Sequence, residues 1–173
     1  MRTGSSRRSW PDSVPLFATP RSPERETLGP NLAQVGDVLG KSFMPHQRLI
    51  SDVALEINPD DEDEFAYRGV IIVLPRQQGK SELILPLVTW RAMAWPSQRI
   101  LYASLTATEA RRRFTDVQLP RLEESPFAGL FRPRRRLTFE AVLWRNGSIY
   151  SPISTTATTG GTGDTSCRAS LRG

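Results

Sequence analysis

Residues 70–82 read VIIVLPRQQGKSE, an apolar and largely β-branched run followed a few positions later by a Gly-Lys-Ser triplet. The run at residues 70–74 is typical of a strand buried on both faces of a parallel sheet. Residues 80–94 then predict a helix, which Pro86 should kink or shorten because proline lacks the amide hydrogen. A buried strand, a loop and a helix in this order are the setting that a phosphate-binding loop requires.

The loop at residues 74–81 carries residue types that suit phosphate. Its backbone N–H groups and those of the first helical turn would point at an anion. Gly79 permits close approach of the backbone, Lys80 would reach the β- and γ-phosphates, and the Ser81 hydroxyl would contact Mg²⁺. The usual loop has glycine where this chain has Leu74, and its interior here is filled by Pro75, Arg76, Gln77 and Gln78. Arg76 could stabilise charge on the γ-phosphate. The alternative interpretation of residues 74–81 is an ordinary strand–turn–helix corner that binds no phosphate.

Two helices and an acidic run are expected before the loop. Residues 32–39 predict a short helix closed by Gly40, and a second helix begins at Pro45. The second helix has an apolar face formed by Leu49, Ile50, Val53, Ala54 and Ile57. The acidic run at residues 60–64 is expected to be a solvated loop rather than a metal site.

Further strands and a helix are expected after the loop. Residues 99–104 predict a second buried strand, and a capping box from Thr106 to Glu109 opens a helix that Pro120 should end. Short strands are predicted at residues 137–139, 141–144 and 148–153, with a hairpin turn at Asn146-Gly147. This order predicts an α/β fold with a parallel sheet flanked by helices. We expect a tail at residues 1–30, disordered or draped, and one domain at residues 31–173.

The composition excludes several classes of protein. No apolar run approaches the ~20 residues needed to span a bilayer, and the N-terminus lacks the apolar stretch of a secretory signal. The single cysteine, Cys167, excludes an internal disulfide and fits a reducing cytoplasm. The formal net charge is +5, and residues 111–136 hold eight arginines against three acids. That basic stretch is either a solvated surface or a phosphate-binding patch.

Several motifs, taken together in their order, resemble the N-terminal ATPase region of the large terminase subunit of tailed double-stranded DNA phages. The resemblance covers roughly residues 29–164. The motifs are FMPHQ (43–47), DVALEI (52–57), VIIVLPRQQGKSE (70–82), RILYASLTATEARRRF (99–114), SPFAGLF (125–131) and LWRNGSIYSPIST (143–155).

The resemblance implies a P-loop NTPase-type fold and roles for individual residues. Gln47 would read the adenine edge, Arg76 would sense or stabilise the γ-phosphate, and Lys80 with Ser81 would bind phosphate and magnesium. The implied cofactors are ATP and Mg²⁺. The implied partners are double-stranded DNA, a small terminase subunit, the portal of a procapsid and further copies in a homo-oligomeric ring, with no membrane. The implied location is the cytoplasm of a bacterial host, with a phage or prophage origin.

The family also requires an acidic strand that holds Mg²⁺ and a glutamate that polarises water. The resemblance places that strand just after residues 163–165, where this chain reads SCRASLRG, and Asp164 lies in a Gly/Thr-rich stretch. We therefore expect a domain that is incomplete at its C-terminus, without the nuclease half, and that binds nucleotide but does not hydrolyse it efficiently. Two alternatives stay open. One is a complete small P-loop NTPase or kinase with Glu140 as its acid, and the other is a basic nucleic-acid-binding module without nucleotide chemistry.

Overall fold

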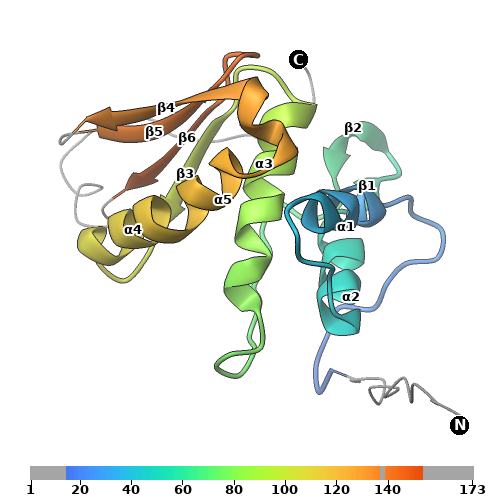
Figure 1. Ribbon diagram of the computed structural model, residues 1–173. Coiled ribbons are helices and arrows are strands. Elements are labelled where there is room, and N and C mark those ends of the chain that lie inside the picture. The colour runs from blue at the N-terminus through green and yellow to red at the C-terminus, as the bar shows by residue number, and fades with distance from the viewer. Residues whose placement is uncertain (1–14, 137–138, 154–173) are drawn as a thin grey trace, which may run out of the picture.

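The computed structural model describes residues 15–136 and 139–153. Sequence predictions that fall on residues 1–14, 137–138 and 154–173, including those on Asp164 and Cys167, lie outside this part of the chain. Figure 1 shows the order of the elements. They are α1 (Gly29–Val38), α2 (Pro45–Ala54), β1 (Ile57–Asn58), β2 (Asp61–Phe65), the 3₁₀ helix η1 (Lys80–Glu82), α3 (Ile84–Ala94), β3 (Arg99–Ala103), α4 (Ala107–Arg113), the π-helix η2 (Phe114–Gln118), α5 (Leu119–Glu123), the 3₁₀ helix η3 (Pro126–Leu130), β4 (Phe131–Arg136), β5 (Phe139–Trp144) and β6 (Ile149–Ile153).

The main sheet has four strands in the order β3-β6-β5-β4. Only β3 and β6 run parallel, and the other two pairs are antiparallel. The fold is therefore mixed α/β with helices against the sheet. The sheet itself is mixed, whereas the sequence predicted a parallel one. The helical run from α4 to α5 lies along one face of the sheet (Figure 1). There the Tyr150 hydroxyl donates to Gln118 Oε1, and the Phe114 and Tyr150 rings lie 5.4 Å apart.

Helix α3 joins the sheet to the N-terminal helices. Its side chains are buried around most of its circumference, with Leu85, Val88 and Trp90 in the hydrophobic core. Pro86 lies in the first turn, where a missing amide hydrogen costs little. It shortens the helix as predicted, because the α-helical part begins only after η1. At the other end, Asn146 Nδ2 donates to Ala92 O at 2.7 Å, which fixes the predicted Asn146-Gly147 turn against the helix.

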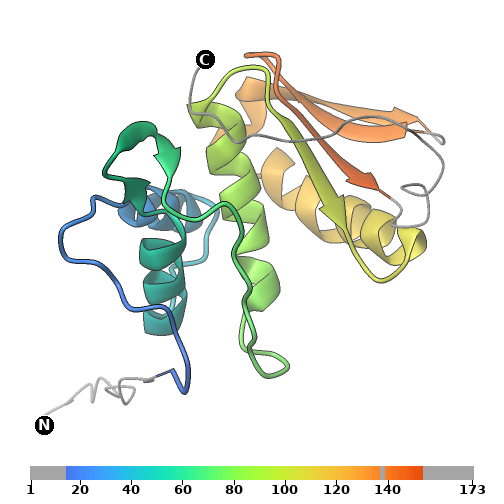
Figure 2. The ribbon, with the colours of Figure 1, turned by 180° about the vertical axis from the view of Figure 1, so that it is seen from behind.

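Residues 69–75 form no strand, so the prediction of a buried strand at residues 70–74 was wrong. Ile71 is 93% exposed and Val73 is 86% exposed, whereas Ile72 packs against the core. Within the described ranges, the backbone groups of residues 69–75 make no hydrogen bonds, and β3 pairs only with β6. Figure 2 shows this segment passing beside α3 to the 74–81 loop, which precedes the N-terminal end of that helix. An apolar run predicts burial of both faces, but only one face has a packing partner here.

Three other predictions also differ from the structure. The acidic run is not a loop, because residues 61–65 form β2 and pair with β1 in a small antiparallel hairpin. Pro120 does not end the helix: the chain widens into η2 just before it and continues as α5, which removes the need for the amide that proline lacks. The arginine-rich stretch of β4 was missed as a strand, since its exposed arginines give no apolar alternation.

A buried carboxylate ties the segment before α1 to the body. Glu56 is fully buried, and its oxygens accept hydrogen bonds from Ser22 N at 2.8 Å, Arg21 Nη1 at 3.1 Å and Arg25 Nη1 at 3.2 Å. Burial raises the pKa of the Glu56 carboxyl, but these hydrogen bonds outweigh it and hold the pKa below its ordinary value. The carboxylate is therefore the stable form, and residues 21–25 lie against β1 through it.

Replacing this carboxylate should weaken the fold in a pH-dependent way. We expect Glu56→Gln to lower the free energy of unfolding at pH 7 by about 1–3 kcal/mol, because two arginines lose their charged partner. Since the folded-state pKa is lowered, the contribution is complete above the ordinary value of 4.5 and is lost as pH falls through the folded pKa. Denaturant unfolding between pH 7 and pH 3 measures this. The exposed Glu62 on β2 supplies the control, because Glu62→Gln should leave both the stability and its pH slope unchanged.

The placement of residues 69–75 predicts the outcome of two glutamate substitutions. Ile71→Glu should change the free energy of unfolding by no more than about 0.5 kcal/mol, because Ile71 lies in solvent. Leu85→Glu should cost about 3 kcal/mol or more, because Leu85 is 2% exposed in the core. Thermal or denaturant unfolding compares the two. If Ile71→Glu instead unfolded the protein, that result would contradict the exposed position of Ile71 and support the buried strand that the sequence predicted.

Candidate phosphate-binding site

The 74–81 loop forms one wall of an open cleft of about 570 Å³, a size within the usual range for small-molecule sites. The segment between α1 and α2 and the start of α2 form the second wall, through residues 41–44 and Gln47. Arg113, at the end of α4, lines it from a third element. All the loop residues that the sequence predicted as binding residues therefore line one cleft: Pro75, Arg76, Gln77, Gln78, Gly79, Lys80 and Ser81.

The loop backbone turns sharply at two positions. Gln77 has φ of 64° and Gly79 has φ of 72°, both in the left-handed region. Glycine adopts this conformation freely, whereas for glutamine it stores strain of the kind that clusters at functional sites. The amide of Glu82 then donates to Gly79 O at 3.0 Å and begins η1. Lys80 and Ser81 thus start a helical turn that lines the cleft.

Gln47 holds the loop against α2. Its side chain is 4% exposed: Oε1 accepts from the Met44 amide at 2.9 Å, and Nε2 donates to Gly79 O at 2.9 Å. The first of these bonds also caps α2, whose first residue is Pro45. His46 adds a second tie, because its Nε2 lies 3.0 Å from Gln78 O. The structure therefore gives Gln47 a positioning role, because its side chain both caps the start of α2 and holds the carbonyl of Gly79.

Most of the charges that line the cleft are positive. Its only carboxylate among the described residues is Glu82, which accepts from Arg121 Nη1 at 2.8 Å and lies 3.3 Å from Lys41 Nζ. Burial raises the pKa of Glu82, but Arg121 and Lys41 outweigh it, so the pKa lies below its ordinary value and the group stays ionised. These contacts also join the loop helix to α5 and to the chain after α1.

Three cations at the cleft lack an acidic partner. Arg76, Lys80 and Arg113 make no ion pair or side-chain hydrogen bond with any described residue. Three guanidinium or ammonium groups against one neutralised carboxylate form a donor set for an anion. Oxygen ligands for a cation are few by comparison: the described part of the chain has no group of three His, Cys, Asp or Glu residues that could hold a metal. Ser81 therefore fits Mg²⁺ only as one ligand beside phosphate oxygens and water.

The structure separates the remaining sequence candidates from the cleft and adds two residues. Glu140 does not line it: this side chain lies on β5 and pairs with Arg111 at 3.0 Å. Lys41 and Arg113 do line it, although neither was predicted as a site residue. Arg113 was counted only as part of the basic stretch, and nothing local distinguishes it from its neighbours. Only the direction in which each helix residue points separates them.

Comparison with known proteins identifies no relative: no family model, no curated protein and no solved structure matches the chain. No helix in the described ranges is long and apolar enough to cross a membrane. The terminase resemblance therefore rests on the quoted motifs alone, and the site rests on its own geometry.

The contact between Gly79 and Gln47 predicts a sensitive position in the loop. A Cβ at residue 79 would lie 2.7 Å from Gln47 Nε2 at a positive φ, so Gly79→Ala should cost about 1–3 kcal/mol of stability or release the loop. Trypsin measures the second outcome directly, since Arg76 and Lys80 are cleavage sites within the loop. Gly69→Ala is the matched control, because an added Cβ there meets no atom within 4 Å. Equal cleavage rates and unfolding midpoints for the two variants would contradict the Gln47 contact.

Proposed function

We propose that the chain binds a nucleoside triphosphate, ATP with Mg²⁺, in the cleft beside the 74–81 loop. The observation that carries this proposal is the convergence on one cleft of Arg76, Lys80 and Arg113, none of which has an acidic partner among the described residues. A triphosphate supplies the negative charge that these groups lack, and it can accept from both backbone amides and guanidinium groups. The strained loop backbone, with its two left-handed residues, is a further feature common at such sites.

Each residue has a defined part in this proposal. Lys80 binds the β- and γ-phosphates, and Arg76 lies beside them as a further cation. Ser81 supplies a hydroxyl to Mg²⁺, which when bound neutralises phosphate charge. Gln47 fixes the carbonyl of Gly79 and so the shape of the loop. A second contact from the Gln47 amide to the adenine edge, as the terminase resemblance implies, is proposed on that resemblance alone.

At the level of the whole protein, we propose the ATPase region of a terminase large subunit, a phage DNA-packaging motor. The order of the motifs from residue 43 to residue 155 supports this reading. Double-stranded DNA, a small terminase subunit, a portal and a bacterial cytoplasm belong to the same proposal. We expect slow turnover by this chain alone, because Glu82 is the only described carboxylate in the cleft and two cations already hold it.

A second candidate is a basic surface for nucleic acid without nucleotide chemistry. The observation that favours it is β4, whose residues 132–135 are exposed and include three arginines. Arg135 pairs with Glu123 at 2.6 Å, which reduces the charge available there. DNA binding that falls steeply with salt and is indifferent to changes at Lys80 would favour this candidate.

The test of the proposed function is direct titration of the full chain with a fluorescent ATP analogue and Mg²⁺. We expect Lys80→Ala to weaken binding by about 10- to 100-fold, the loss of one or two charge-assisted hydrogen bonds. Arg145→Ala is the control, because Arg145 is exposed and lies outside the cleft. The affinity of this variant for the ATP analogue should match that of the unchanged protein. Equal affinities for all three proteins, or no binding by any, would refute the proposal. Fast ATP turnover that depends on Lys80 would refute the expectation of slow hydrolysis.

A further inference from the structure

We propose that Arg113 binds the terminal phosphate of the nucleotide, so that the cleft distinguishes a triphosphate from a diphosphate. This inference rests on the proposed function and adds to it a residue that the sequence motifs did not identify. Arg113 lies 32 residues beyond Ser81, on α4, and reaches the cleft from outside the loop. A ligand group that contacts both the loop and Arg113 must extend away from the loop, as the terminal phosphate of a bound nucleotide does.

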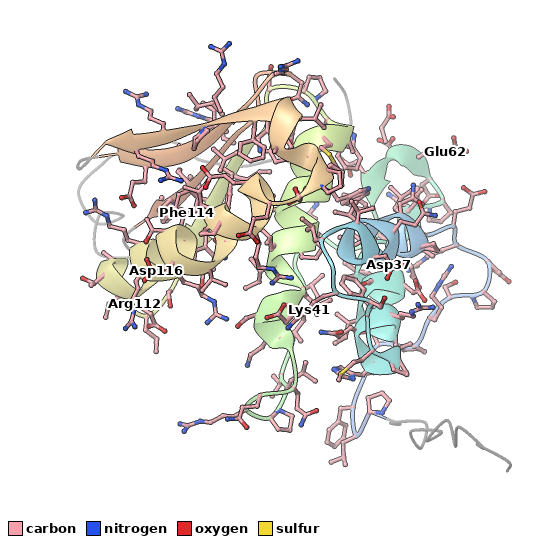
Figure 3. The ribbon with its side chains drawn as sticks, in the orientation of Figure 1. Asp37, Lys41, Glu62, Arg112, Phe114 and Asp116 are labelled. Atoms are coloured by element: carbon pink, nitrogen blue, oxygen red, sulfur yellow. The ribbon has the colours of Figure 1, made fainter. Side chains whose placement is uncertain are left out.

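The three consecutive arginines of α4 point in three directions, and each side chain therefore meets different neighbours. Successive residues of an α-helix are turned by about 100°. Arg111 pairs with Glu140 on the sheet at 3.0 Å, and Arg112 lies 3.5 Å from Asp116 on the outer side of the helix. Figure 3 shows Arg112 and Asp116 together on that side. Arg113 alone of the three faces the cleft and has no acidic partner among the described residues.

The backbone position of Arg113 is fixed by packing on both sides of it. Ala110 and Phe114 are fully buried and hold α4 on the sheet, and the Thr106 hydroxyl caps the helix by accepting from the Glu109 amide at 3.1 Å. The widened turn of η2 begins immediately after Arg113. The side chain is therefore carried on an anchored element and is partly buried. A partly buried guanidinium without a partner is favoured to bind an anion, and its planar donors match two oxygens of one phosphate.

The charges around the loop make the assignment to the terminal phosphate specific. Under the proposed function, Lys80, Arg76 and the loop amides contact the phosphates from the side of the loop, Arg113 contacts the terminal phosphate from α4, and Lys41 is already held by Glu82. A diphosphate on the loop would leave Arg113 without a partner, whereas a triphosphate would supply one. Loss of Arg113 should therefore weaken triphosphate binding and leave diphosphate binding nearly unchanged. A purely structural role would change both affinities together.

The experiment compares the affinities for a non-hydrolysable ATP analogue and for ADP, each with Mg²⁺, in the full chain. We expect Arg113→Ala to lower triphosphate affinity by about 10-fold and ADP affinity by less than about 2-fold. Arg113→Lys should recover part of the preference, since it keeps the charge without the planar donors. Arg112→Ala, from the adjacent and solvent-exposed position, should leave both affinities unchanged. Thermal unfolding without nucleotide checks that each variant folds, and Arg113→Gln replaces Arg113→Ala if that variant does not.

The possible results separate this inference from the proposed function. If Lys80→Ala weakens both nucleotides but Arg113 variants keep the ratio of the two affinities, Arg113 does not contact the terminal phosphate and the inference is wrong. An equal loss for both nucleotides in Arg113→Ala overturns it as well. If Lys80→Ala has no effect or no nucleotide binds, the proposed function fails and the inference fails with it. Only a selective loss of triphosphate affinity supports the inference.

Discussion

The amide of Gln47 is the contact on which the shape of the cleft depends. One end of it accepts from the backbone of Met44 at the start of α2, and the other donates to Gly79 O in the loop. Because the side chain is almost fully buried, either bond left unmade would strand a polar group away from water. The loop carbonyl at Gly79 also starts η1, so the same contact sets where Lys80 begins the helical turn. Helix capping, loop conformation and the position of the lysine are therefore coupled through one side chain.

The distribution of charge around this contact explains more than the net charge of +5 does. Most arginines that form ion pairs join separate segments of the chain, as Arg21 and Arg25 do with Glu56 and as Arg121 does with Glu82. These pairs fasten the segment before α1, and α5, to the body of the molecule. Three cations without an acidic partner among the described residues, from the loop and from α4, line the cleft, and its one described carboxylate, Glu82, is already paired. The cleft therefore carries a local excess of positive charge.

Local signals in the sequence predicted local structure well, but they could not predict which segments pair or pack over long distances in the chain. Gly40 after α1, the Thr106 cap of α4 and the Asn146-Gly147 turn were all placed correctly, because each depends on a few neighbouring residues. The strand at residues 70–74 was wrong because hydrophobicity measures a tendency to be buried but does not supply a partner. The same limit applies to the site. The loop residues carry a recognisable order, whereas Lys41, between α1 and α2, and Arg113, on α4, reach the cleft only through the packing of elements that are distant in sequence.

The absence of strand pairing at residues 69–75 changes how the loop must be held. In the arrangement that the sequence predicted, hydrogen bonds to neighbouring strands would fix the N-terminal side of the loop, and the helix would fix its C-terminal side. Here α3 fixes the C-terminal side, and on the N-terminal side only Ile72 packs into the core while Ile71 and Val73 lie in solvent. The ties from α2, through Gln47 and His46 to two successive loop carbonyls, supply the missing restraint. Since those ties come from a helix, the conformation of the loop depends on the packing of α2 rather than on the sheet.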